Sequence, residues 1–493
     1  MTSPAHSGIN DASHWPALVA VLLVAFTLRM AIAVLLPGIH YPDEVMQSLE
    51  QAHRLVFGTG LVPWEFRDGA RSWLLPGMLA GPMWLGNAVA PGSGAYRWLA
   101  QALIAAITAS SAAIGYVWAK RHGHWPALVA AIVLCTWFEF VYFGARALGE
   151  VVAAAFLFAG VFLCSHHQSA SARRAGVAGF CLGSAFALRF HLAPALALAA
   201  LWYCRSDVRQ RWLPLLAGAS LPLLALGLAD WIAWSQPFAS ILNNFRANIL
   251  EGRSHVYGTS GAGWYVSQLA QQWGLLFPAV LLLAAAGARR EPLALLTALA
   301  IVLAHSVVAH KEYRFIYPAL PLVLLLAALG SAELCGWIAR WPKQAENHAA
   351  MLVVACLAWI AGSIGLAVSP AMHLEWTRGR AGVELMARAG REAHCGVGLL
   401  AAWSWTGGYS SLHRAWPIYL LDWDRNTWST EAFDAWILPR GVLEPQRAGY
   451  RLVQCGPQNA AGATDLCLWV RGGECDDSNA TNEAQRVLNA SGQ

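Results

Sequence analysis

Charged side chains are scarce in this chain, and long apolar runs take their place. Asp, Glu, Lys and Arg make up 12% of the 493 residues, whereas 57% are hydrophobic. A soluble domain carries about twice that share of charge. Apolar runs of about 17 to 25 residues recur along the first three quarters of the chain, as bilayer-spanning helices require. The net charge of +5 forms no basic stripe, so we expect no nucleic-acid partner. The composition predicts an all-α polytopic membrane protein.

Several ligand-binding signatures are also missing. The sequence has no GxxxxGKS/T loop for a nucleotide, no GxGxxG turn after a strand and no HExxH zinc site. None of the ten cysteines is spaced as CxxC, so zinc ligation is not indicated by the cysteines either. Internal repeats, which many transporters show, are absent as well.

About eleven apolar segments predict transmembrane helices. They are residues 16–37, 98–119, 125–143, 147–165, 175–189, 191–204, 212–234, 272–288, 292–309, 315–338 and 349–368. The short pair 175–204, interrupted by Arg189-Phe190-His191, is either two spans or one bent span. With the N-terminus in the cytoplasm, short basic connections such as Arg289-Arg290 fall on the cytoplasmic side. Connections that mix cations with carboxylates then fall on the outer side, among them 38–97, 236–271 and 310–314.

Arg29 lies inside the first predicted span. A long cationic side chain in a span either extends to the interface or faces inward toward a partner. We favour an inward-facing arginine that pairs with an acidic or phosphate group.

The last quarter of the chain differs in kind from the rest. Residues 1–369 form the predicted membrane domain, and residues 370–493 mix polar and aromatic residues with three strand-like stretches. Those stretches are 396–403, 450–453 and 466–470. We expect a small α/β domain outside the membrane. Its four cysteines, Cys395, Cys455, Cys467 and Cys475, permit two disulfides if the domain faces an oxidising compartment.

The segment His40-Tyr41-Pro42-Asp43-Glu44 follows the first span and carries two adjacent carboxylates. Proline suits the first position of a helix, so Asp43 and Glu44 fall in its first turn, where the helix dipole favours an ionised carboxylate. At α-helical spacing, Asp43, Gln47 and Glu50 share one polar face. An ionised carboxylate can act as a general base toward an alcohol. The competing interpretation is an acidic cap on an ordinary amphipathic helix.

Two further outer segments carry polar groups of interest. Trp64 and Glu65 are an aromatic–carboxylate pair typical of sugar sites, and the fork of Arg71 suits a phosphate. The island His310-Lys311-Glu312-Tyr313-Arg314 combines cations with one carboxylate at the mouth of a span. It can neutralise a phosphate leaving group. Interface anchoring and contacts with lipid headgroups are the alternatives for these residues.

Four motifs together resemble glycosyltransferase family 22. The first outer segment contains HYPDEVMQSLEQAHRLVFGTGLVPWEF and GARSWLLP, and the downstream motif is AHKEYRFIYPALPL. Between them, DWIAWSQPF and NFRANILEGRSHVYGTSGAGWY are similar to the middle outer region of the family. The resemblance covers about residues 20 to 330. It implies a GT-C fold and an inverting transfer of mannose from a polyprenyl (dolichyl) phosphate mannose to a lipid-linked glycan or glycolipid. It implies neither a metal nor another cofactor.

Carried over by motif, Asp43 is the expected general base, and Glu44 assists it or binds the acceptor. His310, Lys311 and Arg314 are expected near the donor phosphate. The full expected substrate-binding set is His40, Gln47, Glu50, Trp64, Glu65, Arg71, Tyr257, Trp264, His310, Lys311, Glu312 and Arg314.

The lysine-poor, alanine-rich composition suggests a bacterial source, which predicts a multi-pass inner-membrane protein with its active site on the periplasmic face. Two other functions stay open from the sequence. The same fold can move a different sugar from its polyprenyl phosphate, and a glycolipid transporter can use polar islands as binding sites. The clustering of polar residues on one face favours surface chemistry over transport. The sequence carries no signal for an oligomeric state.

Overall fold

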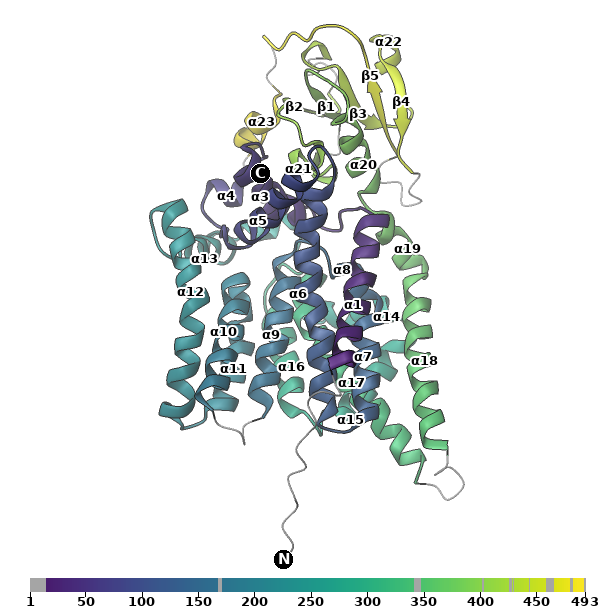
Figure 1. Ribbon diagram of the computed structural model, residues 1–493. Coiled ribbons are helices and arrows are strands. Elements are labelled where there is room, and N and C mark those ends of the chain that lie inside the picture. Colours follow the sequence, from purple (N-terminus) through teal and green to yellow (C-terminus); the bar gives the residue numbers. More distant parts are fainter. Residues whose placement is uncertain are drawn as a thin grey trace, which may run out of the picture.

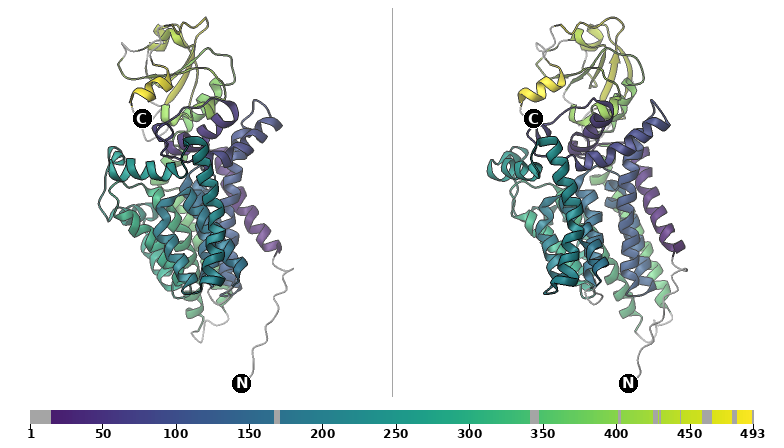
Figure 2. Two further views of the ribbon diagram at one scale, coloured as in Figure 1. Left: turned by 90° about the vertical axis from the view of Figure 1, so that its left-hand side faces the viewer. Right: turned by 60° about the vertical axis from the view of Figure 1, so that its left-hand side comes forward.

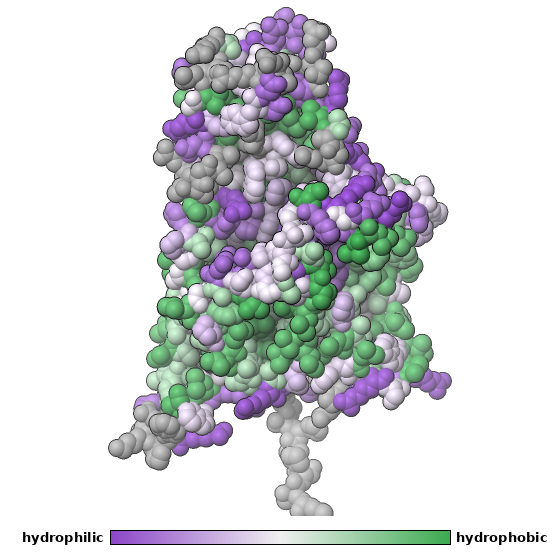
Figure 3. All heavy atoms as spheres, turned by 180° about the vertical axis from the view of Figure 1, so that it is seen from behind, coloured by the Kyte–Doolittle hydropathy of each residue, from purple (hydrophilic) through white to green (hydrophobic). Residues whose placement is uncertain are grey.

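A bundle of apolar helices carries a small mixed sheet at one end (Figure 1). The computed structural model describes residues 15–166, 171–340, 347–400, 403–424, 428, 430–442, 444–457, 465–478 and 482–491. In the two side views, the long helices run roughly parallel and the sheet stays at the same end of the bundle (Figure 2). A belt of hydrophobic side chains covers the bundle seen from behind, with hydrophilic residues beyond both edges (Figure 3). The chain is therefore a multi-pass membrane protein.

The helices of the bundle fall in the segments that the apolar runs predict. They are α1 (Trp15–Leu35), α6 (Ala95–Lys120), α7 (His124–Thr136), α8 (Phe138–Phe143), α9 (Gly149–Ser165), α10 (Ala172–Leu188), α11 (Ala193–Cys204), α12 (Leu213–Trp234), α15 (Leu276–Gly287), α16 (Pro292–Ser306), α17 (Leu320–Ile338) and α18 (His348–Ala367). Among the described residues, five helical segments are long and apolar enough to cross a membrane. A sixth is added if α14 (Trp264–Trp273) and α15, bent by 109°, count as one span. The predicted number of eleven spans is not confirmed by this criterion.

The short pair α10 and α11 is a hairpin rather than one bent helix. Its turn contains η3 (Phe190–Leu192), and Arg189 and His191 at this turn line the same cavity as Asp43. The other ends of the two helices also lie together, since Arg174 of α10 interacts with Tyr203 of α11. The turn therefore lies on the predicted outer side.

Close helix packing in the bundle depends on small residues at crossing points. Helices α15 and α17 cross at Gly287 and Gly330. A Cβ atom at Gly330 would lie 1.9 Å from the carbonyl oxygen of Leu283, and one at Gly287 would lie 2.0 Å from that of Leu326. Only hydrogen at these two positions allows the backbones to approach so closely.

The first outer segment contains short helices with an irregular turn between them. They are α2 (Pro42–Glu44), the π-helical turn η2 (Val45–Leu49), α3 (Glu50–Phe57), α4 (Trp64–Arg67) and α5 (Leu74–Val89). In η2 the backbone N–H of Glu50 donates to the carbonyl of Val45, five residues back. A π-turn contains about one residue more than an α-turn. The turn therefore rotates α3 relative to Asp43. Glu50 leaves the polar face predicted from regular α-helical spacing, whereas Asp43 and Gln47 line one cavity.

The C-terminal region begins with α19 (Pro370–Thr377) and α20 (Arg380–Ala389) and continues into a five-stranded sheet. The strands are β1 (Val397–Leu400), β2 (Ile418–Leu421), β3 (Ala435–Pro439), β4 (Arg451–Cys455) and β5 (Leu466–Val470), in the order β2-β1-β3-β5-β4. β1 is parallel to β2 and β3, while β5 is antiparallel to β3 and β4. The three strand-like stretches of the sequence become β1, β4 and β5, whereas β2 and β3 were not predicted.

The cysteines divide as their surroundings suggest. Cys395 pairs with Cys475, and Cys455 pairs with Cys467, so the predicted pair of disulfides is present in the structure. The six cysteines of the helical part are free and buried.

Arg29 does not have the expected acidic partner. Its side chain is buried and donates to the carbonyl oxygens of Ala25 at 2.9 Å and Leu134 at 3.3 Å. Among the described residues it forms no ion pair with a carboxylate. The preference for an inward-facing arginine is confirmed, but its two terminal nitrogens donate to backbone carbonyls instead of an acid.

Candidate active site

A cavity of about 1580 Å³ lies where the outer segments and the C-terminal region meet the end of the helical bundle. Its walls combine aromatic rings with both signs of charge. The predicted site residues that line it are His40, Asp43, Gln47, Trp64, Glu65, Arg71, Tyr257, His310, Lys311, Glu312 and Arg314. Segments separated by about 270 residues in the sequence thus form one site.

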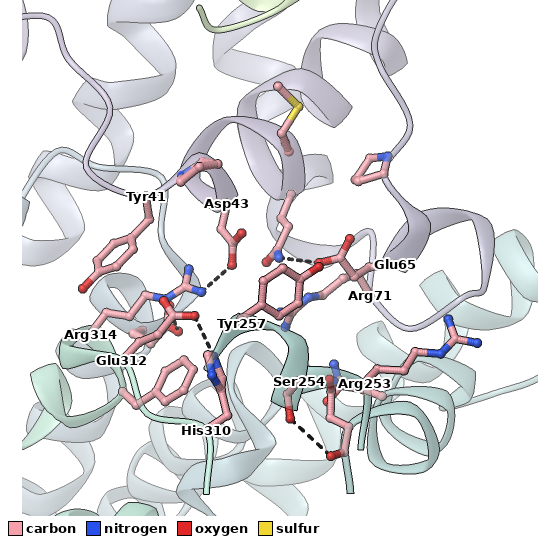
Figure 4. Close-up of a pocket in the computed structure, with 18 of the residues that line it drawn as sticks. Tyr41, Asp43, Glu65, Arg71, Arg253, Ser254, Tyr257, His310, Glu312 and Arg314 are labelled. Atoms are coloured by element: carbon pink, nitrogen blue, oxygen red, sulfur yellow. Dashed lines mark hydrogen bonds and ion pairs between the residues drawn. The ribbon is translucent and has the colours of Figure 1, made fainter. Parts of the chain in front are cut away.

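Asp43 faces this cavity from the first turn of α2 and forms an ion pair with Arg314 (Figure 4). Arg314 belongs to η7 (Tyr313–Ala319), and only 4% of its side chain is exposed, against 27% for Asp43. The guanidinium also lies 4.7 Å from the ring centre of Tyr41. The helix start and the buried guanidinium both place positive charge next to the Asp43 carboxylate.

Arg314 is the centre of a chain of buried charges. Its Nε lies 2.7 Å from Oε2 of Glu312 and 3.6 Å from Oε1 of Glu150. Glu150, in the first turn of α9, in turn lies 2.6 Å from the guanidinium of Arg189. Buried charges require partners, and here each carboxylate has at least one cation. The chain joins η7, α9 and the α10–α11 turn beneath the cavity.

Sequence reasoning did not select Glu150 and Arg189 as site residues. Both stand at the ends of apolar helices on the predicted outer side, where an ionisable group is a sign of function. That rule, applied to every predicted outer connection, would have selected them.

His310 and Glu312 form a second pair at the cavity wall (Figure 4). Nε2 of His310 lies 3.0 Å from Oε1 of Glu312, and its Nδ1 lies 2.9 Å from the carbonyl oxygen of Gly258. The hydrogen bond with Glu312 raises the pKa of His310, although partial burial opposes this shift. Burial alone would raise the pKa of Glu312, but Arg314 and His310 hold it at about 2. The pair thus favours a charged imidazolium at the cavity.

Lys311 is more enclosed than its neighbours. Its side chain is buried, and its ammonium donates to the carbonyl oxygen of Val308. Its charge therefore lies close to the wall formed by the end of α16.

On the opposite wall, Gln47 donates to Oε1 of Glu65 at 2.9 Å. Burial and the neighbouring Asp43 raise the pKa of Glu65, while Arg71 acts in the opposite direction. The Glu65 carboxyl is therefore a weaker acid than an ordinary glutamate. The indole of Trp64 is buried and covered by the guanidinium of Arg253, 5.1 Å from the ring centre. This cover leaves less of the Trp64 ring open for a sugar.

Three of the expected residues are not among the residues that line the cavity. Glu44 points away from Asp43 and binds Arg146 at 2.9 Å, because neighbouring side chains of a helix point in different directions. Glu50 is rotated away by the π-turn and is fully buried against the C-terminal region. Trp264 begins α14 and packs against the main apolar core. We therefore do not assign direct substrate contacts to these three.

Other residues of the cavity wall were not among the site residues predicted from the sequence. These residues are Arg67, Asp68, Arg189, His191, Arg253, His305, Arg378, Trp403, Ser404, Trp405 and Asn489. Those after residue 370 belong to the C-terminal region, and no local pattern in the sequence connects that region with the cavity.

One cluster in the described part of the chain contains three groups able to ligate a metal ion. It consists of Cys395, Asp434 and Cys475, and its two cysteines are joined in a disulfide. It belongs to the C-terminal region and does not line the cavity.

Comparisons with known proteins agree with this architecture. The model of the Alg9-like mannosyltransferase family matches residues 20–381. GPI mannosyltransferase 3 of Yarrowia lipolytica is 27% identical over 423 residues, which cover 81% of this chain and 76% of that protein. GPI alpha-1,2-mannosyltransferase 3 of Mus musculus is 28% identical over 64% of this chain and 59% of its own length.

A solved structure shows the same fold. The crystal structure of ArnT from Cupriavidus metallidurans, bound to undecaprenyl phosphate, superposes with a TM-score of 0.58. The match covers 94% of this chain and all of ArnT at 13% sequence identity, so the likeness is one of fold.

Proposed function

The chain belongs to the Alg9-like mannosyltransferase family and is a membrane glycosyltransferase of the GT-C fold, and we propose a specific reaction for it. It moves mannose from a polyprenyl-phosphate mannose to a hydroxyl of a lipid-linked glycan or glycolipid, with inversion to an α-mannoside. The observation that carries this proposal is the ion pair of Asp43 with Arg314 in a large cavity at one end of the bundle.

Asp43 is the general base of the proposed reaction. An ionised carboxylate that faces the cavity can accept the proton of an acceptor hydroxyl. The acceptor oxygen then forms a bond to C1 of mannose, while the bond from C1 to the phosphate oxygen breaks and its electron pair leaves with the phosphate. Glu65, which lines the same cavity beside Asp43, can form a hydrogen bond with a sugar hydroxyl. Glu44 supports this geometry indirectly, since it anchors α2 to Arg146.

The donor phosphate binds at the wall that contains the cations. Arg314, His310 and Lys311 lie on one connection, and Arg189 approaches from the α10–α11 turn. Charge-assisted hydrogen bonds from these groups would stabilise the negative charge that develops on the leaving phosphate. Arg71 stands across the cavity near Glu65.

The size and position of the cavity support two lipid-linked substrates. A single small-molecule site occupies about 300 to 1,000 Å³, whereas this cavity measures about 1580 Å³. Its lining includes α4 and the C-terminal region, which lie at the end of the bundle beyond the apolar belt (Figures 1 and 3), so lipid tails can remain in the bilayer while headgroups enter. Arg289 and Arg290 line a separate groove. They belong to the basic connections that the positive-inside rule assigns to the cytoplasmic side. We propose a bacterial inner membrane with the cavity on the periplasmic face, where the two disulfides would persist.

The test uses the purified protein in liposomes with radiolabelled polyprenyl-phosphate mannose and a lipid extract as acceptor source. Asp43→Asn removes the base while keeping the shape of the side chain, and we expect label transfer to fall by at least about a hundredfold. Glu392→Gln is the matched control, because Glu392 is an exposed carboxylate that pairs with Arg388 on the surface. Transfer by Asp43→Asn at the wild-type rate would remove Asp43 from the chemistry. Transfer from another polyprenyl-phosphate sugar, but not from the mannose donor, would overturn the mannose assignment.

A further inference from the structure

One wall of the cavity is formed by a short aromatic turn of the C-terminal region. Residues Trp403–Trp405 form the 3-10 turn η9, and all three line the cavity together with Arg378 and Asn489. This turn lies after residue 381, where the family match ends. The reaction derived above uses none of these residues.

The turn is held in one conformation by its own neighbours. The hydroxyl of Thr406 donates to the carbonyl oxygen of Trp403 at 2.9 Å. Helix α20 packs directly on the turn, and a Cβ atom at Gly382 would lie 2.3 Å from the carbonyl oxygen of Trp405. The chain leaves the turn through Gly407 and Gly408, whose φ angles of +81° and +55° favour glycine. The two indoles are therefore presented by a fixed backbone.

Glu50 joins this turn to the helical segment that carries Asp43. Its carboxylate accepts from the backbone N–H groups of Tyr409 at 2.9 Å and Ser410 at 2.7 Å, and from that of Leu61 at 2.9 Å. A Cβ atom at Gly408 would lie 2.6 Å from Glu50 Oε1, so only glycine fits there. The buried carboxylate that the π-turn removes from the cavity thus serves as the docking point of the aromatic turn.

Further contacts fix the C-terminal region over the cavity. The side chain of Gln485 pairs with both the N–H and the carbonyl of Val62, at 2.8 and 3.2 Å. Arg67 donates to Asn489 at 2.8 Å, and the hydroxyl of Tyr96 donates to the carbonyl of Ser410 at 2.7 Å. The distance between the aromatic turn and Asp43 is therefore set by several independent hydrogen bonds.

The chemistry of this wall differs from that of the phosphate wall. Trp403 and Trp405 are half-buried, pack partly on the core of the C-terminal region and line the cavity. Membrane anchoring does not explain them, because the C-terminal region lies beyond the apolar belt (Figures 1 and 3). A flat indole with a polar edge suits a ligand that has one apolar face and hydroxyls around its rim. A pyranose ring has this form.

We propose that Trp403 and Trp405 form an acceptor subsite that stacks on a pyranose of the acceptor glycan. The inference rests on the proposed function and adds to it a source of acceptor specificity outside the matched family region. Arg378, whose guanidinium lies 5.9 Å from the Trp405 ring centre, stands at the edge of the subsite and contributes hydrogen-bond donors to sugar hydroxyls.

The test measures sugar binding and transfer separately. Binding of α-linked mannotriose to the full-length protein in nanodiscs is followed by saturation-transfer NMR, and acceptor and donor KM values are measured in the liposome assay. We expect Trp405→Ala and Trp403→Ala each to weaken mannotriose binding and raise the acceptor KM by about tenfold, the usual scale for a buried aromatic anchor. The donor KM should stay within about twofold. Trp423→Ala is the control, because Trp423 belongs to the same region, is 65% exposed and does not line the cavity.

Four results would distinguish the two proposals. Normal transfer with unchanged mannotriose binding in the tryptophan variants overturns the subsite and leaves the reaction intact. Mannotriose binding that depends on both tryptophans, without transfer by the wild type, supports the subsite and overturns the reaction. Failure of the wild type to bind mannotriose overturns the subsite. If the alanine variants do not fold, Trp405→Phe decides, because phenylalanine keeps an apolar ring. We expect the saturation-transfer signal of this variant to lie between the wild-type signal and the baseline without mannotriose. Full wild-type affinity in this variant would count against stacking on the indole.

Discussion

Replacement of Arg314 by lysine is the sharpest test of the charge arrangement in the cavity. The guanidinium of Arg314 contacts three carboxylates, those of Asp43, Glu312 and Glu150, and its side chain is 4% exposed. Lysine keeps the positive charge but offers a single point charge in place of a planar fork. An ammonium at this position can approach one of the three carboxylates closely and leaves the others without a direct cation.

The magnitude follows from the cost of unpaired buried charge. Removal of one partner of a buried ion pair costs about 3 to 5 kcal/mol. Lysine keeps part of the interaction, so a loss of about 2 to 3 kcal/mol in transition-state stabilisation is expected. This corresponds to a fall in kcat/KM of about thirtyfold to two-hundredfold. Arg314→Ala should exceed this loss and should also lower the thermal stability of the protein.

The assay is initial-rate mannosyl transfer in liposomes over a range of donor concentrations, with folding checked by gel filtration and thermal unfolding. Arg388→Lys serves as the control, because Arg388 forms an exposed pair with Glu392 that is worth about 0 to 1 kcal/mol. If Arg314→Lys retained wild-type kcat/KM, the fork geometry would have no part in the reaction. If lysine and alanine gave equal losses, the positive charge that lysine retains would contribute nothing, and the partial loss expected here would be refuted.

Four other predictions concern the pH response, the docking of the C-terminal region and its disulfide. Glu312 raises the pKa of His310 above its ordinary value of 6.5. The imidazolium is therefore present at low pH and is lost as pH rises through the raised pKa. The transfer rate should fall on this alkaline limb of the pH–rate profile, and His310→Gln should flatten that limb. Burial raises the pKa of Glu50 from 4.5 to about 7. Between these two pH values the folded state holds a proton that the unfolded state releases, so the melting temperature should decrease as pH rises from 4.5 to 7. Glu50→Gln should remove this dependence of the melting temperature on pH. Glu50→Ala leaves three buried N–H groups without an acceptor and should destabilise the protein by about 2 to 4 kcal/mol, seen as faster proteolysis of the C-terminal region; unchanged proteolysis would contradict the docking role. Reduction of the Cys395–Cys475 disulfide, which closes a loop of 80 residues, should destabilise the C-terminal region by about 4 kcal/mol in thermal unfolding, and no shift on Cys395→Ser/Cys475→Ser would refute this contribution.

The membrane character of the chain followed from the sequence alone. Apolar runs must become helices in a bilayer because each backbone polar group needs an internal partner. The alternation of basic and mixed connections then placed Asp43 and Arg314 on one side, and the structure joins them in an ion pair. The motifs around these two residues were enough to indicate the family, because they are local strings of the sequence.

The orientation of individual side chains depended on tertiary structure. Regular α-helical spacing put Glu50 on the face of Asp43, but one π-turn rotated it into the contact with the C-terminal region. No rule of periodicity predicts such a turn, since it is stabilised by packing on both sides of the segment. Glu50 therefore docks the C-terminal region instead of facing the cavity.

The composition of the cavity was also decided by the fold. Glu150 and Arg189 come from helices that the sequence identified only as spans, and they enter the site because Arg314 lies between them and Asp43. The aromatic turn at Trp405 reaches the cavity from a region with short, weakly patterned strands. Sequence patterns extend over one helical turn or one strand, whereas charge pairing and docking act between segments hundreds of residues apart. The sequence by itself thus determined the membrane class, indicated the family and predicted that Asp43 and Arg314 face one side. Only the packed structure decided that these two residues pair and which other side chains surround them.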